Sequence, residues 1–354
     1  MTVQTTSPQS IEPLLQDARN ASYTMACLST EQKNDALGQF ADLINQNRHA
    51  LLAANAKDLK EQEGQISPSL YQRLGLDDNK ITQLVQGIQD VIKLDDPTQQ
   101  CLSKTKLDDG LILEKITVPL GVIGIIFESR PDVMPQILSL ILKSGNAVIL
   151  KGGREASYTN QAFNGLIDQL HTQCDFLPRG WGQLIEGREA VAEMLQFPEY
   201  VDLIIPRGSN DLVKHIMENT RIPVLGHADG ICHLYVHPDA DIEKAVPLVI
   251  DSKIQYPSAC NALETLLVDS QIADTFFSAF LPQAKAATIV LKGCPKTQSY
   301  DASIDAATEA DWKTEYGDKT LAVRVVDGLT NAVAHINQYG SHHTDGILSE
   351  NKAV

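Results

Sequence analysis

The cysteine whose surroundings best suit chemistry in this 354-residue chain is Cys260. It lies in the turn-rich stretch 256–262, between helical spacing that ends near Ile254 and an apolar run at residues 263–268. A thiol at such a turn can meet backbone N–H groups, which lower the pKa of the thiol and stabilise an oxyanion. Cys260 is therefore a candidate nucleophile, and an ordinary packed thiol is the alternative.

Two predicted strand ends carry glycines beside groups that bind anions. Residues 151–154, Lys-Gly-Gly-Arg, follow the apolar run 147–150 and precede a segment of helical spacing. Glycine lets a backbone approach a ligand closely, and the two cations can hold a phosphate. Gly208 and Ser209 follow a second run and start another helix, whose N-terminus attracts anions. A plain strand-to-helix turn and a simple N-cap explain these two segments equally well.

Three histidines, an aspartate and a cysteine between residues 227 and 237 are of the types that ligate metals. Cys232 and His233 are adjacent, however, so on a strand their side chains point to opposite faces. The chain also holds no CxxC pair and no HExxH motif. The sequence therefore predicts no metal site, and His227 is instead a candidate contact for a ligand at a strand end.

The elements that must position these residues follow from the spacing of apolar side chains. Residues 10–94 carry apolar residues three and four apart, which predicts helices. Residues 111–118 alternate between apolar and polar types, as a half-exposed strand or hairpin arm does. From Val122 onward short apolar runs alternate with helical spacing, which predicts βαβ units and a parallel sheet. The predicted strands of this part are 122–127, 147–150, 184–185, 201–205 and 224–225. The polar stretch 295–311 is predicted to be a loop, and the fold class is α/β.

Composition narrows the classes of function. Lys and Arg number 29 against 45 Asp and Glu, which gives a net charge of −16. That balance argues against a nucleic-acid or anionic-membrane surface, because each needs a basic face. No apolar run approaches the ~20 residues of a membrane span, and no secretory signal opens the chain. The six cysteines form no dense framework, as expected of a reduced, cytoplasmic protein.

Several of these segments together resemble one family, gamma-glutamyl phosphate reductase, in order and over nearly the whole chain. The segments that carry the resemblance are 118–124, 127–131, 143–153, 205–208, 223–227, 260–268, 311–316 and 339–344. The resemblance implies an aldehyde dehydrogenase-like fold with an NADP-binding domain at 1–228 and a catalytic domain at 229–354. It also implies a small oligomerisation hairpin at about 108–119. Family members continue past Val354 into a glycine-rich tail, so we expect the chain to be truncated at its C-terminus.

The resemblance also assigns catalytic residues. Cys260, with Asn261 beside it, is expected to attack the acyl phosphate of gamma-glutamyl phosphate, expel phosphate and form a thioester. NADPH would then reduce the thioester to a thiohemiacetal that collapses to L-glutamate 5-semialdehyde, in the second step of L-proline biosynthesis from glutamate. Ser129 or Arg130 falls where related enzymes hold an oxyanion donor. Tyr256 stands where the family more often has Arg, which bears on how the substrate carboxylate is bound.

The expected cofactor is NADPH/NADP. Relatives that prefer NAD carry a Glu where this chain has Arg154, and Arg favours the 2′-phosphate of NADP. Glu315 matches the Glu that positions the nicotinamide ribose. The expected cofactor-binding residues are Lys151, Gly153, Arg154, Gly208, Ser209 and Glu315.

Hydrolytic relatives place a Glu general base in the segment that matches residues 226–230, where this chain has His227-Ala228-Asp229. Release of an acyl group to water needs a base, whereas exchange with phosphate does not.

The resemblance further implies a homo-oligomer when the tail is present and functional coupling to glutamate 5-kinase. The alternatives are another acyl-phosphate or aldehyde dehydrogenase, a metal-assisted dehydrogenase using residues 227–237, and an inactive truncated chain that is not an enzyme.

Overall fold

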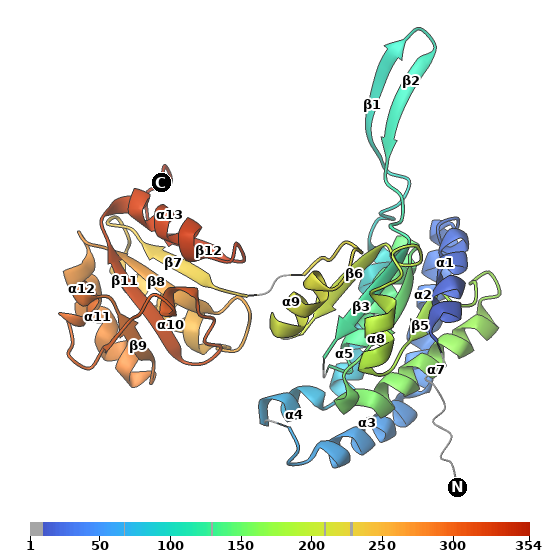
Figure 1. The fold of residues 1–354 in the computed structure, drawn as a ribbon, viewed down its shortest axis with the longest axis horizontal. Coiled ribbons are helices and arrows are strands. Elements are labelled where there is room, and N and C mark those ends of the chain that lie inside the picture. The colour runs from blue at the N-terminus through green and yellow to red at the C-terminus, as the bar shows by residue number, and fades with distance from the viewer. Residues whose placement is uncertain (1–9, 67, 129, 209, 227–228) are drawn as a thin grey trace. The chain divides into compact units, whose positions relative to one another are not determined.

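The computed structural model describes residues 10–66, 68–128, 130–208, 210–226 and 229–354. The chain divides into two compact units, unit 1 at Met1–Gly226 and unit 2 at His227–Val354 (Figure 1). This division lies close to the predicted domain boundary after residue 228. The NADP-binding and catalytic roles given to the two domains stay predictions. Within the described residues, no helix is long and apolar enough to cross a membrane.

Unit 1 is built on a four-stranded parallel sheet in the order β5-β4-β3-β6. Its strands are β3 (Val122–Phe127), β4 (Ala147–Lys151), β5 (Gly182–Leu184) and β6 (Leu203–Arg207). The helices that follow these strands are α6 (Val133–Ser144), α7 (Ser157–Gln173), α8 (Arg188–Met194) and α9 (Asn210–Glu218). Strand β3 is buried at every position, as expected of an apolar run covered on both faces. The predicted α/β class is confirmed, but the predicted strand at 224–225 is only a single bridge between Ile204 and Val224.

Five helices precede the sheet, as the spacing of apolar residues predicts. They are α1 (Glu12–Met25), α2 (Thr30–Gln46), α3 (Arg48–Gln62), α4 (Pro68–Leu74) and α5 (Asp78–Lys93). Side-chain caps set where two of them begin. Ser29 and Gln32 form a capping box at the start of α2, and the Asp77 side chain accepts the Lys80 N–H at the start of α5.

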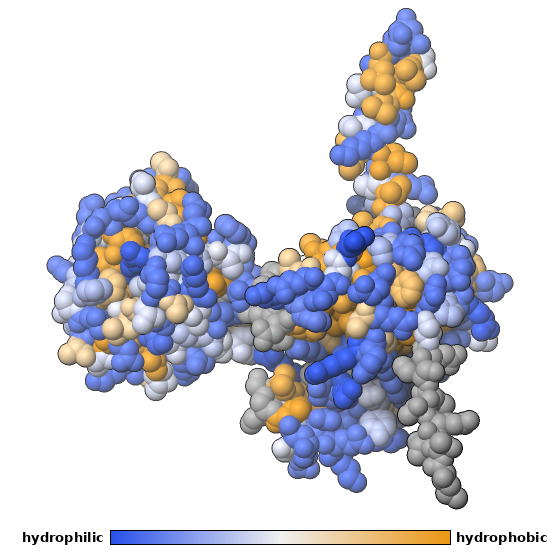
Figure 2. Space-filling view, viewed as in Figure 1, coloured by the Kyte–Doolittle hydropathy of each residue, from blue (hydrophilic) through white to orange (hydrophobic). Residues whose placement is uncertain are grey.

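A two-stranded antiparallel hairpin extends from unit 1 (Figure 1). Strand β1 (Cys101–Asp108) pairs with β2 (Leu111–Ile116), and every residue of both strands is exposed. Figure 2 shows apolar side chains along this hairpin. The large ones are Leu102, Leu107, Leu111, Ile112, Leu113 and Ile116. The hairpin begins at Cys101, earlier than the predicted start at about residue 108. The sequence did not reveal β1 because this strand has too few apolar residues to show an alternating pattern.

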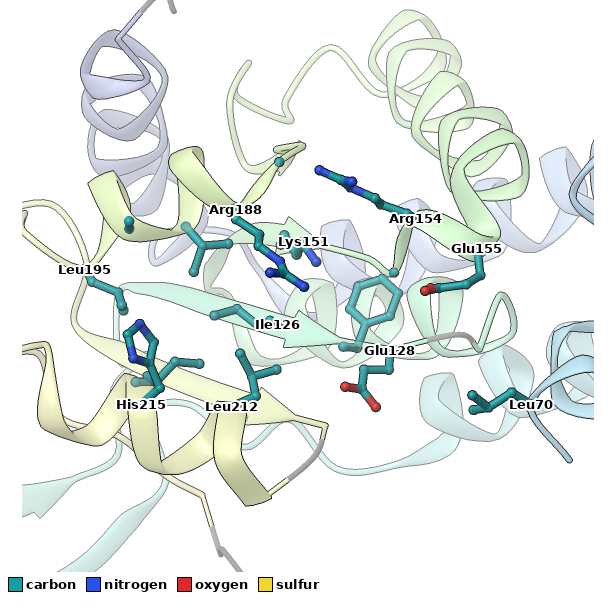
Figure 3. Close-up of a pocket in the computed structure, with 16 residues that line it drawn as sticks. Leu70, Ile126, Glu128, Lys151, Arg154, Glu155, Arg188, Leu195, Leu212 and His215 are labelled. Carbon is teal, nitrogen blue, oxygen red and sulfur yellow. The ribbon is translucent and has the colours of Figure 1, made fainter. Parts of the chain in front are cut away.

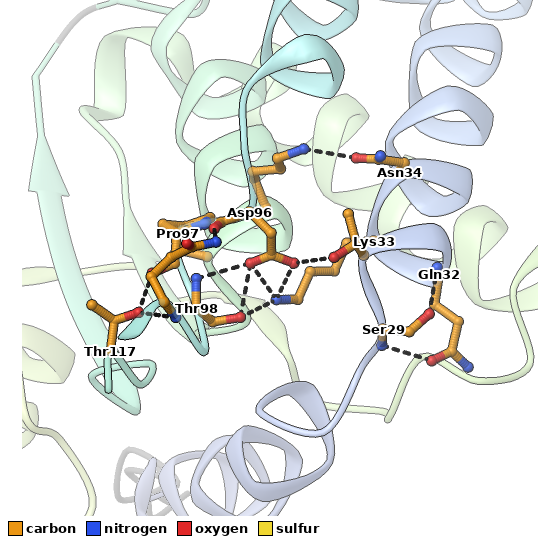
Figure 4. Close-up of polar contacts among 12 residues, drawn as sticks. Ser29, Gln32, Lys33, Asn34, Asp96, Pro97, Thr98 and Thr117 are labelled. Atoms are coloured by element: carbon orange, nitrogen blue, oxygen red, sulfur yellow. Dashed lines mark hydrogen bonds and ion pairs between the residues drawn. The ribbon is translucent and has the colours of Figure 1, made fainter. Parts of the chain in front are cut away.

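A buried ion pair anchors the stem of the hairpin to the helices (Figure 4). Lys33 Nζ lies 3.0 Å from Asp96 Oδ2, and the two side chains are 1% and 11% exposed. Lys33 also donates to Thr98 Oγ1 at 2.8 Å. Burial opposes ionisation of Asp96, but hydrogen bonds from Thr98 and Lys33 outweigh it and lower the pKa of Asp96 to about 2. On the other side of the stem, Thr117 Oγ1 donates to the Pro97 carbonyl at 2.7 Å.

Unit 2 is built on a six-stranded parallel sheet in the order β10-β9-β11-β8-β7-β12. Its strands are β7 (Cys232–Val236), β8 (Leu263–Asp269), β9 (Val290–Gly293), β10 (Asp305–Ala306), β11 (Thr320–Val326) and β12 (Asp345–Leu348). Its helices are α10 (Ile242–Ile254), α11 (Ala273–Ala286), α12 (Pro295–Gln298) and α13 (Gly328–Tyr339). The stretch 295–311, predicted to be a loop, thus contains the short elements α12 and β10.

Candidate active site

A pocket of about 580 Å³ opens in unit 1 at the carboxyl ends of β3 and β4. Open parallel sheets bind their ligands at this edge. Three of the predicted cofactor residues, Lys151, Gly153 and Arg154, line the pocket. Figure 3 shows Lys151, Arg154 and Arg188 on one side of it and His215, from α9, on the other. Arg188 and His215 were not among the predicted site residues; Arg188 follows a glycine at the start of a predicted helix, a signal that could have identified it.

The three cations of the pocket make no ion pair or side-chain hydrogen bond with any residue that the structure describes. Burial lowers the pKa of the Lys151 ammonium. Glu155 and Glu128 oppose that shift, while the positive charges of Arg154 and Arg188 add to it. Two carboxylates, Glu128 and Glu155, also line the pocket, so its three cations leave an excess of positive charge that an anion would offset, and the site suits a phosphate group.

The backbone at the end of β4 needs glycine because a neighbouring side chain approaches it closely. A Cβ at Gly152 would lie 2.2 Å from the Asn160 side-chain nitrogen. The helix that follows, α7, has its first amides occupied: Asp58 accepts the N–H groups of Tyr158 and Thr159 at 3.0 and 2.9 Å. A phosphate in the pocket would therefore be held by the cationic side chains and not by these amides.

The other predicted residues of unit 1 lie on neighbouring loops. Gly208 follows β6, and a Cβ there would lie 2.9 Å from Glu128 Oε1, so the ends of β6 and β3 are close. The Arg130 side chain is exposed, and the Arg130 carbonyl accepts the Val133 N–H at the start of α6. Ser129, Ser209 and His227 lie outside the described residues.

In unit 2, Cys260 lies in the turn between α10 and β8, where the sequence places it. It is a free, partly buried thiol. The Ala259 N–H donates to the Tyr256 carbonyl at 2.9 Å, and the Ala262 N–H donates to the Ala259 carbonyl at 3.0 Å. Two successive backbone turns therefore carry the thiol. Asn261, next to it, is exposed.

The Cys260 backbone is held from the segment that leads into β7. A Cβ at Gly230 would lie 2.1 Å from the Cys260 carbonyl oxygen, so the close approach requires glycine. The Cys232 thiol donates to the same carbonyl at 3.2 Å, and burial raises the pKa of Cys232 to about 11, which keeps it neutral. The Glu315 carboxylate accepts the Gly230 N–H at 2.9 Å. The structure thus brings Cys260 and Glu315 together around Gly230, a link that sequence reasoning missed.

Comparison with known proteins shows the family of this chain. The profile of the aldehyde dehydrogenase family matches residues 1–309. The gamma-glutamyl phosphate reductase of Methanococcoides burtonii is 46% identical over 353 residues, which cover 97% of this chain and 78% of the relative. That of Pelotomaculum thermopropionicum is 49% identical over 337 residues, 95% of this chain and 77% of the relative. The chain belongs to the gamma-glutamyl phosphate reductases of the aldehyde dehydrogenase family.

Solved structures confirm the predicted aldehyde dehydrogenase-like fold. The crystal structure of gamma-glutamyl phosphate reductase from Thermotoga maritima has a TM-score of 0.93 at 35% identity and covers 98% of this chain and 84% of that one. An NADP-dependent glyceraldehyde-3-phosphate dehydrogenase from Bacillus halodurans, solved with NADP, has a TM-score of 0.64 at 16% identity. The match covers 97% of this chain and 79% of that one. As a member of the gamma-glutamyl phosphate reductases, the chain is an oxidoreductase acting on an aldehyde group.

Proposed function

We propose that this chain reduces gamma-glutamyl phosphate to L-glutamate 5-semialdehyde with NADPH, the second step of L-proline biosynthesis from glutamate. The observation that carries the proposal is the geometry of the turn at residues 256–262, which carries Cys260. Cys260 is free and partly buried, and its carbonyl is held by the Gly230 backbone and the Cys232 thiol. Relatives at 46% and 49% identity over most of the chain carry the name of this reductase.

In this proposal Cys260 supplies the nucleophile. Its thiolate sulfur bonds to the acyl carbon, the bond from that carbon to the phosphate oxygen breaks, and phosphate leaves with the electron pair. The chemistry that NADPH would supply, when bound, is a hydride for the thioester carbon. The resulting thiohemiacetal oxyanion then re-forms the carbonyl as the carbon–sulfur bond breaks, which releases the aldehyde and restores the thiolate. Asn261, next to the thiol, would donate a hydrogen bond to the oxygen while it is negative, and an oxyanion role for Ser129 or Arg130 stays a prediction from the family resemblance.

The unit 1 pocket is the proposed site for NADPH. Lys151, Arg154 and Arg188 give the pocket more positive charge than its two carboxylates, Glu128 and Glu155, offset, which fits a ligand that carries phosphate. Gly153, Gly208 and Ser209 are proposed to complete this site, and the role of Glu315 at the nicotinamide ribose stays a prediction from the family resemblance. Arg154 and Arg188 are proposed to select NADP over NAD through the 2′-phosphate.

The hairpin is the proposed assembly surface for further copies of this chain. Its apolar side chains are all exposed in the single chain, with Leu113 at 57% and Ile112 at 53%. An exposed apolar surface of this kind is typical of an interaction site.

A cytoplasmic location and functional coupling to glutamate 5-kinase stay predictions.

The reverse reaction tests the proposed function. Glutamate 5-semialdehyde and NADP are supplied with and without phosphate, and the appearance of NADPH is followed for the chain, Cys260→Ala and the control Cys27→Ala. We expect activity that requires phosphate, is lost in Cys260→Ala and is kept in Cys27→Ala, because Cys27 is exposed and lies in unit 1. Activity without phosphate would instead support the second candidate, a hydrolytic aldehyde dehydrogenase.

A further inference from the structure

A completely buried ion pair joins the two ends of the segment that carries the thiol. Lys253 lies in the last turn of α10, and Glu264 is the second residue of β8. Lys253 Nζ lies 2.7 Å from Glu264 Oε2, and the side chains are 0% and 1% exposed. The intervening residues, 254–263, include Cys260. The ion pair therefore closes the base of the loop that presents the nucleophile.

The same carboxylate also holds a second functional loop. The Gly317 N–H donates to the other oxygen, Glu264 Oε1, at 3.3 Å. Lys253 Nζ lies 6.0 Å from the centre of the Tyr316 ring. Tyr316 and Gly317 directly follow Glu315, whose carboxylate contacts the backbone that packs on Cys260. One buried pair thus contacts both the thiol loop and the Glu315 loop.

Stability alone does not account for this pair. Removing two charges from water is costly, and replacing a buried ion pair by apolar residues of similar size is often neutral or stabilising. Burial raises the pKa of Glu264, and the hydrogen bond and charge of Lys253 oppose that shift. An apolar pair could not fix the orientation of the two loops. The ion pair joins one nitrogen to one carboxylate oxygen, and the second oxygen accepts the Gly317 N–H.

We propose that Lys253 and Glu264 are positioning residues of the reductase, whose ion pair fixes the Cys260 turn relative to the Glu315 loop. The inference rests on the proposed function, since it assigns these residues a role in the same site. Neither side chain reaches solvent, so both act through the loops that they hold and not by contact with substrate. Misplacing a reacting group by about 1 Å can cost on the order of 100-fold in rate.

The test replaces the pair by two apolar residues in the double variant Lys253→Met/Glu264→Leu. Single substitutions are avoided because each leaves one buried charge without its partner, which is strongly destabilising. The matched control is Lys296→Met/Asp327→Leu, which removes an ion pair of 3.1 Å in the same unit whose side chains are 60% and 64% exposed. For the double variant we expect a folded chain, with a melting temperature that falls by no more than the loss of the hydrogen bond from the Gly317 N–H explains. We also expect a kcat at least about tenfold lower, while KM for NADP stays within about threefold.

A second measurement does not depend on turnover. The rate at which iodoacetamide alkylates Cys260 is followed by peptide mass spectrometry, and we expect at least a threefold faster reaction in the double variant, because a loosened turn exposes the thiol. Unchanged kcat and alkylation rate, or failure of the double variant to fold, would overturn the inference. If the wild-type chain showed no reductase activity, the proposed function would fail, and the alkylation rate would still decide whether the pair positions the thiol.

Discussion

Arg188 lines the pocket and adds a positive charge to those of the predicted residues Lys151 and Arg154. It brings a second guanidinium into a pocket that already holds Lys151 and Arg154, in a chain whose net charge is −16. A local group of cations can therefore bind a phosphate against the overall field of the protein. We expect Arg188→Gln to raise KM for NADPH about tenfold, the effect of losing one charge-assisted contact, and to leave KM for NADH within about twofold. Steady-state kinetics with both cofactors measure this difference.

The matched control for that substitution is Arg221→Gln, because Arg221 is exposed and does not line the pocket. It should leave both KM values unchanged. An equal rise in KM for NADPH and NADH in Arg188→Gln would contradict a role in 2′-phosphate selection.

Helix α13 carries a buried histidine that links the stability of unit 2 to pH. His335 is 4% exposed, and its ring lies 5.5 Å from the His233 ring. Burial, together with the charges of His233 and Arg324, lowers the pKa of His335 to about 3. The unfolded chain, with a His pKa near 6.5, binds this proton more readily, so the stability contributed by neutral His335 is lost as pH falls below about 6.5.

From that shift we expect His335 to account for a fall of about 2 kcal/mol in the free energy of unfolding of unit 2 between pH 7 and pH 5, which His335→Gln removes, while His233, whose pKa burial also lowers, adds to the fall in both chains. Urea unfolding followed by Trp312 fluorescence, with Trp181→Phe in every chain, reports on unit 2 because the Trp312 ring lies 5.4 Å from His335. His342→Asn is the control, since His342 is exposed. A pH slope that is the same in wild type and His335→Gln would rule out this linkage.

The hairpin gives a second prediction at the scale of one element. Leu111 and Leu113 are 55% and 57% exposed on β2 and lie on one face of it, because alternate residues of a strand share a face. If this face packs on another copy, Leu111→Glu/Leu113→Glu should lower the mass in solution toward that of one chain, as measured by light scattering. Glu114→Gln, which changes an exposed residue on the other face of β2, should not change the mass. A mass that is the same in wild type and the double variant would exclude this face from assembly.

At the scale of the whole molecule, the sequence predicted the features that are determined by local patterns, namely the spacing of apolar residues and the residue types at strand ends. The α/β class, the turn that carries Cys260 and the strand end that carries Lys151 and Arg154 follow from short-range patterns, and the structure has all of them. The contacts of Glu315 with Gly230 and of Lys253 with Glu264 join segments through the folded sheet of unit 2. Polar residues at these positions have no period that distinguishes them from surface residues, so the sequence alone could not pair them.

One measurement tests the central claim most directly, that the acyl group is carried on Cys260 and passed to phosphate. The chain is mixed with glutamate 5-semialdehyde and NADP in the absence of phosphate, and NADPH and the intact mass are followed. We predict a burst of one NADPH per active site and a chain heavier by one glutamyl group on Cys260, with turnover starting only when phosphate is added. Continuous turnover without phosphate, or a burst that persists in Cys260→Ala, would contradict the account.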